Sequence, residues 1–229
     1  MKTKKQQPIA IFDIDGTIFR SSLLIELTKS LVSFGIFPKL VHTEIQRTEQ
    51  RWLDRKGSYE EYLNQVIKVF SKRLKGVSVN DVHRISALVI QEEKNRVYTY
   101  TRDLLSRLRK THRLVAISGS PEVIVQEFQK AWKFDDVFGT IYESHAGVYT
   151  GNVTFVASHD KSSLLKEYCA SNGLRLTRSI GVGDTETDIP FLELVSRPVA
   201  FNPNRKFLHA ARQKGWAVVV ERKDVVYTI

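Results

Sequence analysis

Four short apolar runs, each ending in or just before polar residues, constrain the fold of this chain more than any other feature of its sequence. The runs are residues 8–15, 114–117, 179–183 and 198–201. Continuous apolar runs of this length are typical of strands that are buried on both faces, as the strands of a parallel sheet are. We therefore expect neighbouring strands with polar residues at the carboxyl edge of the sheet, where open α/β sheets bind ligands.

Helical patterns separate these runs. Apolar residues recur at helical spacing in residues 101–110, 121–132 and 162–172. Pro121 suits the first turn of the second helix, and Gly173 suits the end of the third. Strands that alternate with helices favour a parallel sheet. The expected fold class is therefore α/β, with a Rossmann-like parallel sheet sandwiched by helices.

Residues 20–97 differ from the rest of the chain because they contain helical patterns and no convincing strand. The helical stretches are residues 23–34, 38–53, 59–70 and 79–98. We expect an all-helical insert at residues 20–97, within an α/β core made of residues 1–19 and 98–229. Residues 138–157 are rich in Tyr, Thr, Val and Gly, and this composition predicts a small β element (a β excursion) that extends from that core.

Composition narrows the class of protein. The chain has 229 residues with 42% hydrophobic content, which suits one large domain or a core with an inserted subdomain. The single cysteine, Cys169, excludes an internal disulfide and a multi-cysteine zinc site, and it favours a reducing compartment. No stretch approaches the roughly 20 apolar residues of a membrane span, and the apolar stretch behind basic residues 1–7 is too short for a signal peptide. We expect a cytoplasmic protein, monomeric or homodimeric, without a membrane partner.

The formal net charge of +10 favours anionic partners. Phosphorylated small molecules and nucleic acid both fit this charge, and so does a basic surface that is merely solvated. Trp52 stands among arginines in the sequence, which would suit a patch for a polyanion. Packing of Trp52 between helices of the insert is the alternative.

Asp13 and Asp15 suit the chemistry of phosphoryl transfer. One carboxylate can attack phosphorus, and its neighbour can protonate the leaving oxygen and later activate water. Two residues apart on a strand, their side chains would point the same way. Such crowded acids need a counter-charge, which a hard divalent ion such as Mg²⁺ supplies. Gly16 would let the chain turn sharply beside them.

Three later clusters supply the other groups of such a site. The Ser118 hydroxyl and nearby backbone N–H groups can hold phosphate oxygens, and Lys161 can neutralise charge on the phosphate and on Asp13. Asp184 and Asp188 would bring further acids toward the ion. Each cluster alone fits a plainer interpretation: a turn, a loop, a surface lysine or the acidic start of a helix. Their order and their placement at strand ends favour function.

At these residues the chain resembles the haloacid dehalogenase superfamily of phosphatases, over nearly its whole length. Asp13-Ile14-Asp15-Gly16-Thr17 matches the first motif of that family, Ser118 the second, Lys161 the third, and Gly183-Asp184 with Asp188 the fourth. The helical insert directly after the first motif is similar to the C1-type cap of the phosphoserine-phosphatase-like branch (subfamily IB).

The resemblance implies a role for each of these residues. Asp13 would be the nucleophile and a Mg²⁺ ligand, and Asp15 would be the general acid/base, with its backbone carbonyl on the metal. Asp184 would ligate Mg²⁺, and Asp188 would support the metal site or orient the lysine. The phosphate-binding residues would be Ser118, Gly119 and Lys161.

Two positions depart from the phosphoserine phosphatases. Those enzymes place a Glu nine residues after the nucleophile to meet the ammonium of the substrate, and Ser22 stands there in this chain. Thr187 also replaces a commonly seen Asn in the fourth motif. The nearest acid to Ser22 is Glu26, which is a candidate substrate residue or a solvated helix acid. The departure at Ser22 counts against phosphoserine itself as the substrate.

The expected function is Mg²⁺-dependent hydrolysis of a small phosphorylated metabolite through an aspartyl-phosphate on Asp13. The alternatives within enzymes are a phosphotransferase and an end-processing phosphatase that acts on nucleic acid. The non-enzymatic alternative is a catalytically inactive binding module.

Overall fold

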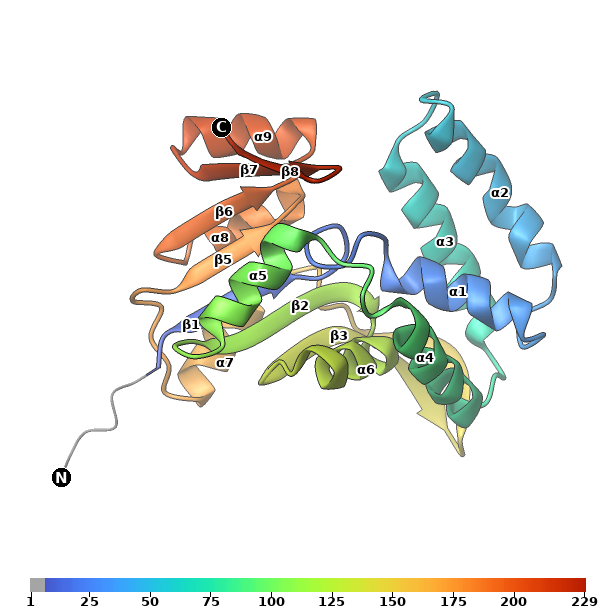
Figure 1. Ribbon diagram of the computed structural model, residues 1–229. Coiled ribbons are helices and arrows are strands. Elements are labelled where there is room, and N and C mark those ends of the chain that lie inside the picture. The colour runs from blue at the N-terminus through green and yellow to red at the C-terminus, as the bar shows by residue number, and fades with distance from the viewer. Residues whose placement is uncertain (1–6) are drawn as a thin grey trace.

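A mostly parallel sheet runs through the computed structural model, which describes residues 7–229 (Figure 1). Its strands are β1 (Ile9–Asp13), β2 (Arg113–Pro121), β3 (Asp136–His145), β4 (Val148–Phe155), β5 (Ile180–Gly183), β6 (Arg197–Phe201), β7 (Ala217–Arg222) and β8 (Val225–Thr228). They are ordered β4-β3-β2-β1-β5-β6-β7-β8 across the sheet. All neighbours pair in parallel except β3 with β4 and β7 with β8. The predicted α/β class with a parallel sheet is confirmed.

Helices cover both faces of β1, the central strand. Its alternate side chains enter two separate hydrophobic clusters, Ala10 and Phe12 on one face and Ile9 and Ile11 on the other. The first cluster includes α5 (Thr99–Leu108) and α6 (Glu122–Trp132), and the second includes α7 (Lys161–Ser171), α8 (Ile189–Leu192) and α9 (Arg205–Gln213). Burial on both faces explains why this run is apolar without alternation.

Four helices lie between β1 and α5, where the insert was expected. They are α1 (Leu23–Ser33), α2 (Leu40–Leu53), α3 (Tyr59–Leu74) and α4 (Val79–Glu93), and they extend to one side of the sheet (Figure 1). The segment enters and leaves the core at adjacent points, because Phe19 and Val97 form an antiparallel bridge. The division of the chain into a cap of residues 20–97 and a core of residues 1–19 and 98–229 stays a prediction.

The β3–β4 hairpin extends the sheet toward the helical segment, at the place of the predicted β excursion. Three backbone hydrogen bonds join this hairpin to the loop between α3 and α4 and to the first residue of α4, and we call them the hairpin tether. They link Gly76 to Tyr149 (2.8 Å), Tyr149 to Val77 (2.9 Å) and Val79 to Gly147 (2.9 Å). The helical segment is therefore attached to the core both at the Phe19–Val97 bridge and at the hairpin.

The strands beyond β6 were not predicted from the sequence. β7 pairs in parallel with β6, and β8 closes the edge by antiparallel pairing. Every residue of β8 is exposed, so this strand lacks the pattern of a buried one. Within residues 7–229, no helix has both the length and the apolar character needed to cross a bilayer. Of the basic N-terminal stretch, residues 1–6 lie outside the described residues.

Candidate active site

The predicted site residues meet at the carboxyl edge of the sheet. Asp13 is the last residue of β1, Asp184 directly follows β5, and Ser118 lies near the end of β2. Because these three strands are adjacent and parallel, their ends deliver the three side chains to one place. Lys161, the first residue of α7, joins them there.

Lys161 is buried between two carboxylates. Its Nζ donates to Asp13 Oδ1 and to Asp188 Oδ1, both at 2.6 Å. The three side chains are 8% exposed or less, so their charges interact with little screening by water. Burial acts to lower the pKa of Lys161, but the two carboxylates outweigh it and the net shift is upward, so the lysine stays charged. The plainer interpretation of Lys161 as a surface residue is wrong.

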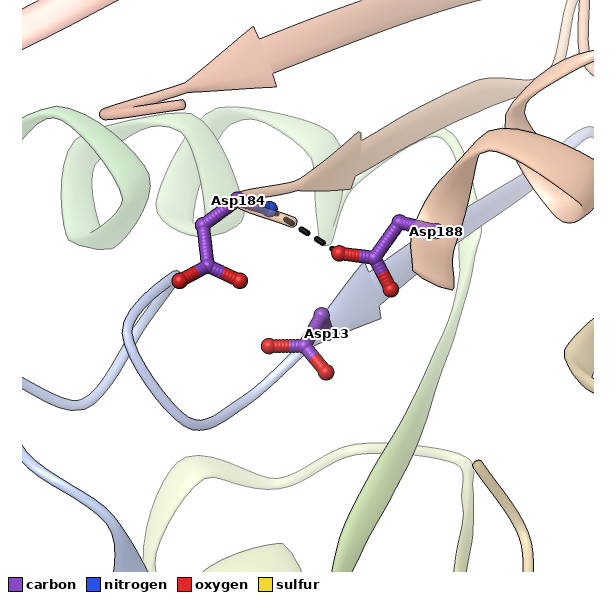
Figure 2. A group of neighbouring side chains, drawn as sticks. All are labelled: Asp13, Asp184 and Asp188. Atoms are coloured by element: carbon purple, nitrogen blue, oxygen red, sulfur yellow. Dashed lines mark hydrogen bonds between the residues drawn. The ribbon is translucent and has the colours of Figure 1, made fainter. Parts of the chain in front are cut away.

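Asp188 ends the short 3₁₀ helix η1 (Glu186–Asp188) and also holds the backbone at the end of β5. Its Oδ2 accepts from the N–H of Asp184 at 3.0 Å and from that of Thr185 at 3.2 Å. The first of these bonds is drawn in Figure 2. A Cβ added at Gly183 would lie 2.4 Å from Asp188 Oδ2, so a glycine is needed at this close approach. One carboxylate thus contacts both Lys161 and the backbone of Asp184.

Asp13, Asp184 and Asp188 form an acidic cluster in which the carboxylates point toward one another (Figure 2). One oxygen from each residue lies within 4.8 Å of the others. Asp13 Oδ2 is buried and has no hydrogen-bond partner among residues 7–229. The unpaired buried oxygen of Asp13 and the neighbouring carboxylates together form a set of hard oxygen ligands. This set fits Mg²⁺ or a similar divalent cation.

The acidic cluster carries more negative charge than Lys161 balances. Burial raises the pKa of Asp13 to about 7, opposed by the Lys161 cation and reinforced by Asp188 and Asp15. Burial and the charge of Asp13 also raise the pKa of Asp184 well above its ordinary value. An additional positive charge close to these carboxylates would therefore stabilise the cluster.

Asp15 lies in a separate set of hydrogen bonds. Its Oδ2 accepts from the hydroxyls of Ser118 at 2.5 Å and Ser120 at 2.9 Å, and its Oδ1 accepts from the Leu23 N–H at 2.6 Å. Burial raises the pKa of Asp15, and these three bonds act against that rise. The two aspartates of the first motif therefore occupy different environments, one paired with a cation and the other with neutral donors. Sequence reasoning gave Ser120 no role, although it lies two residues beyond Ser118 in the same strand.

Gly119 lies between these two serines at the end of β2. Its carbonyl accepts from the Thr140 hydroxyl at 2.8 Å, which anchors this end of β2 to β3. A Cβ added at Gly119 would lie 3.2 Å from Ser158 Oγ. Gly119 is exposed whereas Ser118 is fully buried, so the backbone of this stretch is open to a ligand at the glycine.

Of the two candidates for substrate contact, Ser22 is buried and Glu26 is paired within the protein. Ser22 is 2% exposed and lies at the start of α1. Glu26 Oε1 accepts from the Ser21 hydroxyl at 2.7 Å and forms an ion pair with Arg96 at 3.0 Å. The Glu26 side chain is 16% exposed, so this helix acid is partly solvated and paired with Arg96.

Tyr59 is the first residue of α3, and the charges of Asp15 and Asp184 act on it. The sequence pattern had assigned Tyr59 only to a helix. Burial raises the pKa of its hydroxyl, and the negative charges of Asp15 and Asp184 add to that shift. Its ring lies edge-on to Trp52, with centroids 5.2 Å apart, and Trp52 also stacks on Tyr62 at 5.8 Å. Trp52 is therefore packed between α2 and α3, which agrees with the packing interpretation.

Comparison with known proteins identifies a family. Residues 10–193 match the model of the haloacid dehalogenase-like hydrolases, a span that contains every site residue described above. The chain belongs to the haloacid dehalogenase-like hydrolase family. The resemblance read from its motifs, and the enzyme class that it implies, are confirmed.

Relatives of this hydrolase include proteins named as phosphatases. Phosphoserine phosphatase SerB1 of Mycobacterium tuberculosis is 26% identical over 93% of this chain and 72% of its own length. The inhibition of morphological differentiation protein of Streptomyces azureus is 26% identical over 92% of this chain and 77% of its own. A histidinol-phosphatase of Neisseria meningitidis is 32% identical, over 46% of this chain and 50% of its own.

Solved structures share the fold of this hydrolase. A Bordetella pertussis protein of unknown function matches with a TM-score of 0.75 and 18% identity, over 93% of this chain and 98% of the other. A phosphoserine phosphatase, solved as an analogue of its phospho-aspartyl intermediate, matches with a TM-score of 0.62 and 18% identity, over 96% of both chains. At these identities the likeness concerns the fold.

Proposed function

We propose that this hydrolase is a Mg²⁺-dependent phosphatase that acts on a small phosphorylated metabolite through an aspartyl-phosphate on Asp13. The position of Asp13 carries the proposal. One of its carboxylate oxygens is bound by Lys161, and the other is unpaired, within residues 7–229, in the acidic cluster. Relatives named as phosphatases support the same reaction class.

In the first step Asp13 attacks the phosphorus of the substrate with a carboxylate oxygen, and the bond from phosphorus to the leaving oxygen breaks. Lys161 neutralises charge on Asp13 and on the transferred group. Ser118 and the backbone at Gly119 bind phosphoryl oxygens. The carboxylates of Asp13 and Asp184, with the backbone carbonyl of Asp15, would hold Mg²⁺, which would neutralise charge on the phosphate.

Asp15 acts on the leaving oxygen. It donates a proton to that oxygen as the aspartyl-phosphate forms, and then, as a carboxylate, removes a proton from the water that cleaves the acyl phosphate. Asp188 takes no part in bond making, and it keeps Lys161 and the backbone of Asp184 in place through the contacts described above.

Residues 20–97 would act as a cap that excludes bulk water and selects the substrate. Glu26 is committed to Arg96 and Ser22 is buried, so neither is placed as a free partner for an ammonium group. Tyr59 is 37% exposed near the acids and offers an aromatic surface instead. We therefore propose a substrate other than phosphoserine, whose leaving group contacts Tyr59.

Asp13→Asn tests the nucleophile. With Mg²⁺ present, the variant should release no phosphate from 4-nitrophenyl phosphate or from a panel of phosphoserine, phosphoethanolamine, phosphocholine, histidinol phosphate, sugar phosphates and nucleotides. Its circular dichroism should match that of the parent. Asp103→Asn, on the exposed face of α5, is the matched control and should keep full activity.

Turnover by Asp13→Asn would overturn the assignment of Asp13. A parent protein that cleaves a 5′-phosphorylated oligonucleotide, with a steep dependence on salt, and leaves the small phosphates intact would favour the end-processing alternative. A parent protein that releases no phosphate from any of these compounds would favour a binding module.

A further inference from the structure

Ser120 is a buried residue of β2 that bridges the general acid to the helical segment. It is 2% exposed, and its hydroxyl contacts Asp15 Oδ2 at 2.9 Å and the backbone nitrogen of Leu24 at 3.0 Å. A backbone N–H can only donate, so the hydroxyl accepts from Leu24. Its single proton is therefore directed to Asp15.

The start of α1 depends on these two core residues. Within the described chain, the side chain of Ser22, at the N-cap position, makes no capping hydrogen bond. Two of the free N–H groups of the first turn are instead satisfied by Asp15, which accepts from Leu23 at 2.6 Å, and by Ser120, which accepts from Leu24. Residues at the carboxyl edge of the sheet thus cap α1, a helix of the segment that covers this edge.

Ser118 cannot serve Asp15 and the phosphate at once. Its hydroxyl has one proton, which it donates to Asp15 Oδ2 at 2.5 Å in this structure. When that proton turns to a phosphoryl oxygen, the remaining donors to Asp15 are Ser120 and the Leu23 N–H. The position on Oδ2 that Ser118 leaves is then open for the proton that Asp15 transfers.

We propose that Ser120 is a positioning residue that holds the Asp15 carboxyl toward the leaving oxygen while Ser118 binds the phosphate. This inference rests on the proposed phosphatase reaction. It predicts that loss of the Ser120 hydroxyl harms proton transfer to the leaving group more than it harms phosphate binding or attack by Asp13. The effect should then depend on how much the leaving group needs a proton.

Two aryl phosphates of similar shape separate these effects. The 4-nitrophenolate ion leaves readily without a proton, whereas the phenolate ion of phenyl phosphate is more basic and depends on the acid. The measured quantity is kcat/KM, because it reports the steps up to formation of the aspartyl-phosphate. The variants are Ser120→Ala, Ser120→Cys, which keeps the volume with a weaker donor, and Ser120→Thr, which restores a hydroxyl.

Ser120→Ala and Ser120→Cys should lose about ten-fold more kcat/KM on phenyl phosphate than on 4-nitrophenyl phosphate, a part of what a general acid contributes. Ser120→Thr should return that ratio to within about three-fold of the parent. Ser86→Ala is the matched control, since Ser86 is fully buried in α4 and its hydroxyl has no partner among residues 7–229. It should leave both rates unchanged.

Equal losses on the two substrates, or no loss on either, in an active parent background would overturn the positioning role and leave the proposed function standing. If Ser120→Ala does not fold, Ser120→Cys carries the same comparison. A parent protein that is inactive on both aryl phosphates would overturn the proposed function together with this inference.

Discussion

Gly16 turns the chain directly after the two aspartates of the first motif, and its place beside Asp184 allows a test of the acidic cluster. Its φ of +84° is a left-handed conformation that other residues disfavour. A Cβ at this position would lie 2.2 Å from Asp184 Oδ2, whereas ordinary contacts begin at 3.4 Å. In Gly16→Ala the Asp184 carboxylate must therefore move by about 1 Å, a displacement large enough to matter for catalysis.

Two effects act together in Gly16→Ala. The left-handed backbone costs about 1–2 kcal/mol of stability when a side chain is added. A displacement of about 1 Å at a catalytic group costs on the order of 100-fold in rate. We therefore expect kcat to fall by about 100-fold. The Mg²⁺ concentration for half-maximal activity should rise, because the displaced Asp184 is a proposed Mg²⁺ ligand.

Gly215→Ala is the matched control for backbone strain. Gly215 has φ +64°, and a Cβ there would meet nothing within 4 Å among the described residues. Urea unfolding should show similar destabilisation of both variants, and steady-state kinetics over a range of Mg²⁺ should show a loss in Gly16→Ala alone. Unchanged kcat in Gly16→Ala would refute the reasoning about Asp184. An equal kinetic loss in Gly215→Ala would assign the effect to strain.

Two further predictions concern charge. Lys161→Met leaves the carboxylates of Asp13 and Asp188 buried without their cation, so we expect a loss of about 3–5 kcal/mol in urea unfolding at neutral pH and no measurable turnover; a variant as stable as the parent would contradict this. At the start of α7, the Ser163 N–H and its neighbours lower the pKa of Asp160 from 3.8 to about 2. Its ionised form therefore stabilises the fold above about pH 4 and loses that effect as the pH falls toward 2. Asp160→Ala should be less stable than the parent near neutral pH, by a margin that shrinks over this range; a margin that stays constant to pH 2 would contradict the assignment.

The sheet and the main site residues could be predicted because their signals are local in the sequence. A strand buried on both faces by helices needs a continuous apolar run, and β1 and β5 each have one. Asp13 and Asp184 lie at the ends of those runs, so parallel pairing alone brings them together. Edge strand β8 gives no such signal, because it buries little on either face.

The partners of individual side chains could not be predicted, since they join distant parts of the chain. Glu26 pairs with Arg96, 70 residues away, and Ser120 bonds the backbone of Leu24, 96 residues away. Both contacts depend on how the helical segment lies on the sheet. No local pattern of apolar residues specifies that placement. The sequence therefore indicates the proposed reacting groups better than the residues that orient them.

The hairpin tether restricts how the helical segment can open. If both the tether and the Phe19–Val97 bridge persist, the segment can only rotate about an axis that passes through these two attachments. α4, which packs against α6, would then travel little. α2 and the first turn of α3, which carries Tyr59, would sweep the longer arc. The size of leaving group that can enter would therefore be set by the swing of α2 and α3, and not by travel of the whole segment.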